Sequence, residues 1–516
     1  MRSISCITTA KKAMIWLLAL CLLLGLVPVQ AAENELNLCM VSSQTQWLNP
    51  LVAEEREFQS LTALIYEGLF YIDDDYKPQN NLVESCDIDG ANWLITLRTD
   101  VYFHDGTPVT AYDVEATINE ILRLAANGEG QYSQLKYIIK SVSINNTNSL
   151  LITMNRPYYG NYFALTFPIL PASQVQAQNP VGSGPYKVDS FVPGSHLHLS
   201  VNPYWRERTP VIEYISVSFK ERNSMLLEEY EFNRVDAAIT RSASAGQYQT
   251  GISNLNIPYR TNQLEVLLMN NRKGPTSDER VRKAIRYAID VNAISSHCYS
   301  GTAIRTDTPM PYGTWMYSPN DSYYEYNPEK AKALLAEAGW EDLDGDGYLD
   351  KYENNEKVTL SITLLVYEEQ SNSVRIPAAN MIKNMLGQVG IKVTVSSVSF
   401  QNASQKLGVS NFGMCLAAFQ MDPVPDPGFL LMSANTGNFG LYKSSNMDNL
   451  FKKLRVTMDP TEYQSILWQI QDQFGQDCPF ICLYYRAGAL LTRRVFTNAR
   501  DVREPEILRG IEDIVN

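Results

Sequence analysis

The sequence predicts an α/β protein with at least two lobes. The first observation is length: the chain has 516 residues, more than one hydrophobic core normally holds. The second is that segments with strand-like and helix-like apolar spacing alternate along the chain, without a tandem repeat or a low-complexity tract. Such alternation is typical of α/β lobes.

The first 31 residues are predicted to be a signal peptide. Three basic residues precede an uncharged run at 13–27, and a small-residue cleavage site ends at Ala31. Fifteen uncharged residues are short for a transmembrane span. We therefore expect an exported protein, periplasmic or at the cell surface, cleaved near Ala31. The alternatives are a retained anchor and a lipoprotein acylated at Cys21, although the bulky Leu20 before it fits acylation poorly.

The first half of the mature chain is predicted to begin with strands. Residues 35–41 alternate apolar and polar side chains, as a half-buried strand does. Residues 93–98 and 150–154 also have the character of strands. Between them we expect a helix to begin near Ala111, because Thr110 and Asp113 have the spacing of a capping box.

The second half contains three predicted helices. Apolar residues at i, i+3 and i+4 predict a helix over 279–294. Another is expected over 329–338, ending at Gly339 as helices commonly do. The third, over 378–389, precedes a strand expected at 391–395.

Composition and motifs argue against several function classes. The formal net charge is −13, and it becomes −16 without the three basic residues of the leader. So acidic a chain is not expected to bind nucleic acid or anionic membrane surfaces. The sequence contains no nucleophile elbow, zinc-protease motif, phosphate loop or dinucleotide fingerprint. We therefore expect a protein that is not an enzyme, with a secreted hydrolase as the alternative.

Six cysteines remain after cleavage: Cys39, Cys86, Cys298, Cys415, Cys478 and Cys482. An exported location permits disulfides. The alternative is that most are small buried thiols. Cys478 and Cys482 are expected on one face of a strand, where i and i+4 positions lie too far apart to bond each other.

Short motifs follow one another in a fixed order along most of the chain. They are Phe-His-Asp-Gly-Thr-Pro at 103–108, a Gly-Pro-Tyr element within 179–186, Asn-Pro-Tyr-Trp at 202–205, and the segments 281–290, 327–340 and 422–427. In this order they resemble the extracytoplasmic solute-binding proteins of family 5, the peptide- and nickel-binding class that feeds ABC importers.

The resemblance implies a periplasmic-binding-protein-like fold of two lobes (type II, the large peptide-binding class) with an extra subdomain. Lobe I would combine 33–60, 181–262 and 483–516, with 61–180 as its subdomain and 263–482 as lobe II. The chain would cross between the lobes near 262–268 and 480–483.

The resemblance also implies a function. We expect a monomer that closes over a short peptide and presents it to the permease and ATPase subunits of an ABC importer, with no cofactor required. Alternatives with the same fold are binding of a nickel complex, haem, a glutathione-like peptide or an oligosaccharide. A receptor that signals to a membrane sensor is a further alternative.

The ligand site is expected around Asp422. In peptide-binding relatives an Asp at this motif holds the α-ammonium of the ligand, and such a charge-assisted bond is stronger in a water-poor cleft. The alternative role for Asp422 is to cap the Pro-rich turn that follows it. The other implied contacts are Phe419, which stands where a Trp is more usual, Gln420, Met421, Ser43, Gln44 and Arg375. Arg375 is a candidate for the peptide carboxylate, or else a solvated residue at the start of a helix.

An Asp-rich loop matches a calcium-binding template. The segment 342–353 fits D-x-D-x-D-G-x5-E. Its expected ligands are the carboxylates of Asp342, Asp344, Asp346, Asp350 and Glu353 and the carbonyl of Tyr348. Oxygen ligands at this spacing suit a structural calcium ion. A surface turn is the alternative, because residues 358–362 after the loop are predicted to form a strand.

Overall fold

The structure is a computed structural model. It describes residues 34–515 except 43–45, 54, 249, 252–253, 301–302, 321–324, 368–373, 497–501 and 512–513. The predicted signal peptide and the expected ligand contacts Ser43 and Gln44 lie outside the described residues. Among the described residues, no helix combines the length and the apolar character needed to cross a membrane.

One mixed sheet of 11 strands runs through the molecule, in the order β17-β16-β18-β12-β19-β11-β1-β10-β9-β8, with β13 paired to β19. Its strands are β1 (Glu35–Val41), β8 (Tyr186–Val192), β9 (His196–Val201), β10 (Tyr214–Lys220), β11 (Ala237–Thr240), β12 (Leu255–Met269), β13 (Ile304–Arg305), β16 (Ser361–Tyr367), β17 (Lys392–Val398), β18 (Met414–Gln420) and β19 (Phe480–Thr492).

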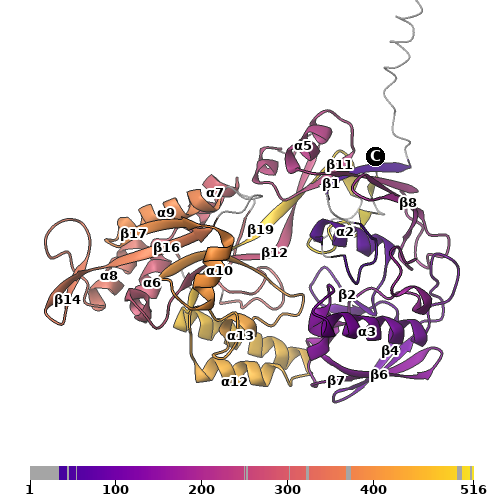
Figure 1. Cartoon of the computed structure of the whole chain (residues 1–516), viewed down its shortest axis with the longest axis horizontal. Helices are drawn as coiled ribbons and strands as arrows, with labels where there is room; N and C mark the ends of the chain where they lie inside the picture. The colour runs from indigo at the N-terminus through magenta and orange to yellow at the C-terminus, as the bar shows by residue number, and fades with distance from the viewer. Residues whose placement is uncertain are drawn as a thin grey trace, which may run out of the picture.

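Two long antiparallel strands, β12 and β19, join the halves of this sheet. In the middle of their pairing the register shifts between Arg260 and Leu264. The strands on the β8 side form the first lobe and those on the β17 side the second, and Figure 1 shows the two groups on either side of β12 and β19. The segments predicted to connect the lobes therefore lie within two paired strands. The residue boundaries predicted for the lobes stay a prediction.

The second lobe packs helices on both faces of its strands. Successive residues of β16 alternate between two cores: Leu364 and Val366 belong to one, Leu365 and Tyr367 to the other, as the period of a strand requires. The helices are α6 (Glu279–Ala288), α7 (Val291–Tyr299), α8 (Pro328–Glu337), α9 (Arg375–Gly387), α10 (Phe400–Gly408), α11 (Gly428–Leu431), α12 (Ser445–Leu454) and α13 (Pro460–Asp477). The hairpin of β14 (Asp350–Glu353) and β15 (Glu356–Thr359) extends from this lobe.

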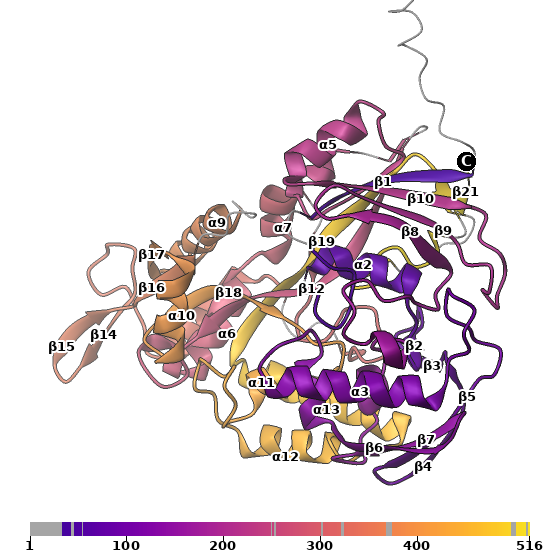
Figure 2. The ribbon, with the colours of Figure 1, turned by 45° about the vertical axis from the view of Figure 1, so that its right-hand side comes forward.

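The subdomain is a four-stranded antiparallel sheet covered by a helix. The strands, in the order β4-β5-β7-β6, are β4 (Val83–Asp89), β5 (Asn92–Leu97), β7 (Ser149–Met154) and β6 (Ile139–Asn146), and the helix is α3 (Ala111–Ala126). The smaller elements beside the subdomain and the first lobe are α2 (Arg56–Ile65), β2 (Phe70–Ile72), β3 (Pro78–Asn80), α4 (Asn161–Ala164), α5 (Asn223–Glu231), β20 (Val495–Phe496) and β21 (Ile514–Val515). Figure 2 shows α2 between the β8–β10 strands and the subdomain. Met40 of β1 and Trp93 of β5 belong to one continuous core.

One local prediction is confirmed and another is wrong in part. The capping box at the start of α3 is present, with the Asp113 side chain accepting from the Thr110 backbone N–H at 2.8 Å. The helix predicted over 279–294 is wrong in one respect, because Ile289 is extended and Asp290 caps a second helix, its carboxylate accepting from Ala293 N–H at 3.0 Å. In the structure all six cysteines are free.

The motif at 103–108 and the Gly-Pro-Tyr element within 179–186 lie against each other and have a structural role. The backbone N–H of His104 donates to the Gly182 carbonyl at 2.8 Å, and its ring contacts the Gly184 carbonyl at 3.1 Å. A Cβ on Gly182 would lie 1.8 Å from the Ile65 carbonyl oxygen, so only glycine fits there. Burial lowers the pKa of His104 to about 4, so this residue stays neutral inside the scaffold.

Candidate functional site

The site predicted around Asp422 opens into a pocket where the subdomain, the two connecting strands and the second lobe meet. Its lining comes from seven stretches of the chain: Ile72 with Tyr76; Phe163 with Thr166; Arg260–Asn262; Pro309–Pro311 with Met316; Met421–Pro427; Tyr485; and Arg503–Glu506. Most of these side chains are apolar or aromatic, with a few charged groups. A mainly apolar pocket with a few polar groups is the usual form of a ligand site.

Asp422 follows the end of β18 and faces this pocket. Its side chain is open to solvent, yet the surrounding protein removes enough water to raise the pKa of its carboxyl, and the charge of Asp426 raises it further. Within the described part of the chain, its carboxylate accepts no hydrogen bond and forms no ion pair. The predicted turn-capping role of Asp422 therefore has no hydrogen bond to support it, and the carboxylate is open to a cationic ligand group.

Asp426, four residues later, is already engaged. Its carboxylate accepts from Arg455 Nε at 2.6 Å and from Nη2 at 3.0 Å, a bidentate pair. It also accepts from the Gly428 backbone N–H at 2.9 Å. The capping that sequence reasoning assigned as the alternative role of Asp422 is thus performed by Asp426.

The other residues predicted beside Asp422 differ in their positions. Met421 lines the pocket, and its backbone N–H donates to the Asn262 carbonyl at 2.8 Å. Phe419 instead packs on the Phe429 and Phe439 rings, 6.1 and 6.2 Å away between centroids. Gln420 is exposed at the end of β18 and does not line the pocket.

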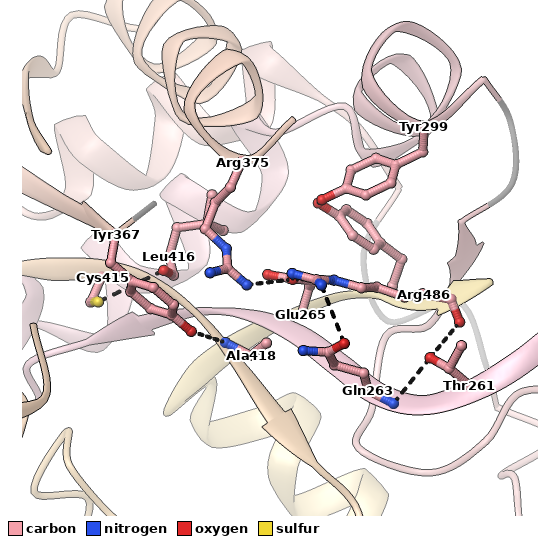
Figure 3. A network of polar contacts seen from close by, with 11 residues as sticks. Thr261, Gln263, Glu265, Tyr299, Tyr367, Arg375, Cys415, Leu416, Ala418 and Arg486 are labelled. Carbon is pink, nitrogen blue, oxygen red and sulfur yellow. Dashed lines mark hydrogen bonds and ion pairs between the residues drawn. The ribbon is translucent and has the colours of Figure 1, made fainter. Parts of the chain in front are cut away.

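Arg375 is neither solvated nor directed into this pocket, contrary to both predictions for it. Its guanidinium is buried at the start of α9, donates to Glu265 Oε1 at 2.8 Å and lies over the Tyr367 ring. Arg486 of β19 donates to the same oxygen through Nε at 2.6 Å, as Figure 3 shows. Glu265 is fully buried, so one carboxylate joins β12, β19 and α9 near the site where the connecting strands shift register.

The strand order places this network and Asp422 at one edge. β16 pairs in parallel with both β17 and β18, and α9 and α10 pack on opposite faces of these strands. The connection after β16 leads to β17 on one side of it, and the next connection leads back to β18 on the other side, so the strand order reverses between β16 and β18. Ligands of open α/β sheets bind at the carboxyl ends of the strands beside such a reversal. Tyr367 is the last residue of β16, and its hydroxyl accepts a hydrogen bond from the backbone N–H of Ala418 in β18 at 3.2 Å.

Sequence reasoning missed the C-terminal segment that closes the pocket. Arg503 donates to the Ile72 and Asp73 carbonyls at 2.9 and 2.6 Å. The Arg260 and Arg503 guanidinium groups both lie against the Tyr76 ring, 4.8 and 4.1 Å from its centroid. Glu504 accepts from the Asn262 backbone N–H at 3.1 Å. No motif or spacing marks these residues, because they come from three distant parts of the chain, at 72–76, 260–262 and 503–504.

The Asp-rich loop brings together three of its five predicted carboxylates. Ligand oxygens of Asp342, Asp344 and Asp350 lie within 4.8 Å of one another. Asp342 organises the turn by accepting from the Gly345 and Gly347 backbone N–H groups at 2.8 and 3.1 Å.

The other two predicted carboxylates, those of Asp346 and Glu353, are not part of this group. Glu353 is ion-paired with Lys351 at 2.6 Å, and the Asp346 side chain accepts from the Tyr348 backbone N–H at 2.8 Å. The Lys357 ammonium contacts Asp344 and approaches Asp350. The group therefore already contains a positive charge, and it matches the template only in part.

Comparison with known proteins identifies the class. The family model for bacterial extracellular solute-binding proteins, family 5 (middle), matches residues 77–440. The oligopeptide-binding protein AppA of Bacillus subtilis is 25% identical over 467 residues, covering 85% of this chain and 83% of AppA. The glutathione-binding protein GsiB of Pectobacterium atrosepticum is 25% identical over 516 residues, covering 91% and 92%. The crystal structure of NikZ from Campylobacter jejuni in complex with Ni(L-His) matches with a TM-score of 0.71 at 21% identity, covering 94% of this chain and 100% of NikZ.

The chain belongs to family 5 of the bacterial extracellular solute-binding proteins. It is a solute-binding protein of an ABC transporter, a non-enzymatic component that works with permease and ATPase subunits. The mixed α/β fold is the one that the peptide- and nickel-binding proteins of this class share.

Proposed function

We propose that this protein binds short peptides in the pocket beside Asp422 and presents them to the permease of its ABC importer. The observation that carries the proposal is the state of Asp422: its carboxylate faces the pocket and has no partner among the described residues. Asp426 and Glu504, which line the same pocket, are each held by an arginine. A peptide α-ammonium would supply the charge partner that Asp422 lacks.

The rest of the lining supports an apolar ligand body with few charges. Met310, Met316 and Met421 contribute flexible apolar side chains, which adapt to different partners. Tyr76 and Tyr485 contribute aromatic rings. Such a lining suits a receptor that accepts peptides of varied sequence, with main-chain hydrogen bonds providing the common affinity.

The names of the relatives support a peptide ligand without deciding its length. AppA is an oligopeptide-binding protein and GsiB binds glutathione. NikZ was solved with Ni(L-His), but the described residues that line the pocket include neither His nor Cys. Bare nickel is therefore a poorer candidate than a peptide. We further propose that the mature protein acts as a monomer outside the cytoplasmic membrane and that its two lobes close over the ligand.

Calorimetry with free and N-acetylated peptides tests the proposal. We expect di- to pentapeptides with a free α-ammonium to bind with micromolar or tighter affinity, and their acetylated forms to bind much more weakly. Equal affinities would contradict the role of Asp422. A titration with the nickel–histidine complex is the parallel measurement, and tight binding of that complex with no binding of peptides would replace the peptide proposal.

A further inference from the structure

An aromatic contact joins the subdomain to the second lobe beside the ligand pocket. Tyr158 and Tyr159 lie just after β7 of the subdomain, yet Tyr158 is buried as part of a second-lobe core. The Tyr159 backbone N–H donates to the Thr457 carbonyl, beyond α12, at 2.9 Å. Residues far apart in the sequence therefore form a common apolar interface here.

Four rings make up this contact, which we name the aromatic clasp: Tyr158 and Tyr159 from the subdomain, and Trp315 and Tyr463 from the second lobe. Tyr463 lies 5.8 Å from Tyr158 and 5.2 Å from Tyr159 between ring centroids. Trp315 meets Tyr159 edge-on at 6.2 Å. These separations are in the range in which aromatic pairs attract. Trp315 also donates from its ring N–H to the Tyr76 carbonyl at 2.7 Å.

The clasp is tied to the loop that carries the ligand site. The Tyr158 hydroxyl lies 3.5 Å from Asp426 Oδ2 and 3.3 Å from the Tyr463 hydroxyl. The Tyr463 hydroxyl donates to the Pro425 carbonyl at 3.3 Å. Pro425 and Asp426 belong to the same pocket-lining loop as Asp422. One end of this loop therefore contacts the clasp, and the other end, with Asp422, faces the pocket.

We propose that the aromatic clasp holds the subdomain against the second lobe, and that the Met421–Pro427 loop couples the clasp to ligand binding at Asp422. The coupling rests on the function proposed above, whereas the holding role does not. A ligand favours the closed protein only if it binds that state better than the open one. A cation on Asp422 removes the repulsion between this carboxylate and Asp426, so it strengthens the arrangement in which Asp426 contacts Tyr158.

The clasp can be tested from either side without a ligand. Tyr159→Ala removes the subdomain ring, Trp315→Ala removes a ring of the second lobe, and Tyr137→Ala is the matched control, because Tyr137 is an exposed subdomain tyrosine outside the clasp. Small-angle scattering of each ligand-free protein should give a larger radius of gyration for Tyr159→Ala and Trp315→Ala than for the wild type and Tyr137→Ala. Thermal unfolding shows which variants are folded. One folded clasp variant is enough for the comparison of radii. Equal radii in all folded proteins would overturn the proposal.

The coupling is tested with the tripeptide Ala-Ala-Ala as the probe. We expect the clasp variants to bind it roughly tenfold more weakly than the wild type, mainly through faster dissociation, because the closed state is less populated. Unchanged affinity together with a larger ligand-free radius would overturn the coupling and leave the holding role. If the wild type fails to bind this and other free peptides, the function proposed above fails, while the radii still decide whether the clasp holds the lobes.

Discussion

Asp422 and Asp426 lie four residues apart on one pocket-lining loop, but only Asp426 has a cationic partner. Arg455 holds Asp426 through two hydrogen bonds, whereas no described group donates to Asp422. The neighbouring negative charge also raises the pKa of Asp422. Asp422 is therefore an unpaired carboxylate in a pocket, close to a second carboxylate. A bound cation would relieve the repulsion between the two.

The first prediction is that Asp422→Asn abolishes most peptide binding. The amide cannot form the charge pair, so binding should weaken by about 2–5 kcal/mol, measured by calorimetry with free peptides. The matched control is Glu506→Gln, because Glu506 lines the same pocket and already faces Arg509. Equal losses in both variants would show that general negative potential, and not Asp422 itself, attracts the ligand.

The second prediction concerns the pH dependence of stability. Because the folded protein raises the pKa of Asp422, this group contributes stability that is present below the usual pKa of an Asp and is lost as the pH rises through its raised pKa. Ligand-free Asp422→Asn should therefore melt at a higher temperature than the wild type at neutral pH, and the difference should shrink in acid. A variant that melts lower than the wild type at neutral pH would contradict this assignment.

Peptide affinity should have the opposite pH dependence, which is the third prediction. The neutral acid form of Asp422 cannot pair with an ammonium, so affinity should fall as the pH drops through the raised pKa of its carboxyl. The loss should begin at a higher pH than the usual Asp range. Calorimetry of a free peptide across a pH series measures it, with Asp422→Asn as the control in which this pH dependence should be absent. A flat profile in the wild type would count against the ammonium pair.

The fourth prediction concerns the buried carboxylate between α9 and β19. Glu265→Gln removes the negative charge that Arg375 and Arg486 both contact. Removing one member of a buried ion pair typically costs about 3–5 kcal/mol of stability, which urea unfolding would measure. Glu353→Gln is the control, because its exposed pair with Lys351 should be worth no more than about 1 kcal/mol. Similar losses in the two variants would contradict the structural role assigned to Glu265.

The local elements were largely predictable from the sequence, but long-range contacts were not. The capping box at Thr110 is a local pattern, and the structure confirms it. The spacing of Val281, Ile285, Ala288 and Ile289 predicted one helix, and all four side chains are indeed buried in one core. The break at Ile289 is marked only by Asp290, whose capping role depends on the backbone conformation. Periodicity reports which face is buried, not whether the backbone is continuous.

The candidate site could be predicted only where a motif marked it. Asp422 lies in such a motif, and the structure places it in a pocket. The partner of Arg375 is Glu265, 110 residues away, so nothing near Arg375 in the sequence indicates that its guanidinium is buried. Arg260 and Arg503 meet only because the C-terminal segment lies beside β12. Local sequence patterns carry no information on which distant residues meet in the fold.

The fifth prediction concerns calcium at the Asp-rich loop, where the carboxylates of Asp342, Asp344 and Asp350 converge. Gly347, at the sixth position of the template, has a φ of +87°, as the sharp turn of such a loop requires. If calcium binds here, its addition should raise the melting temperature, because an ion that binds only the folded state stabilises it. Outside the cell even a site with a Kd of about 10⁻⁴–10⁻³ M would be occupied.

Substitutions in and beside the group make this calcium prediction specific. Lys357→Ala should enlarge the calcium response, because the Lys357 ammonium contacts Asp344 and would compete with the ion. Asp344→Asn should abolish the response, since it removes a ligand charge, and Glu353→Gln should preserve it, because Glu353 pairs with Lys351 outside the group. Peptide affinity should stay the same in all three variants, because none of these residues lines the pocket. If calcium and a chelator give the same melting curve in both the wild type and Lys357→Ala, the loop is a surface turn whose carboxylates are neutralised by lysine.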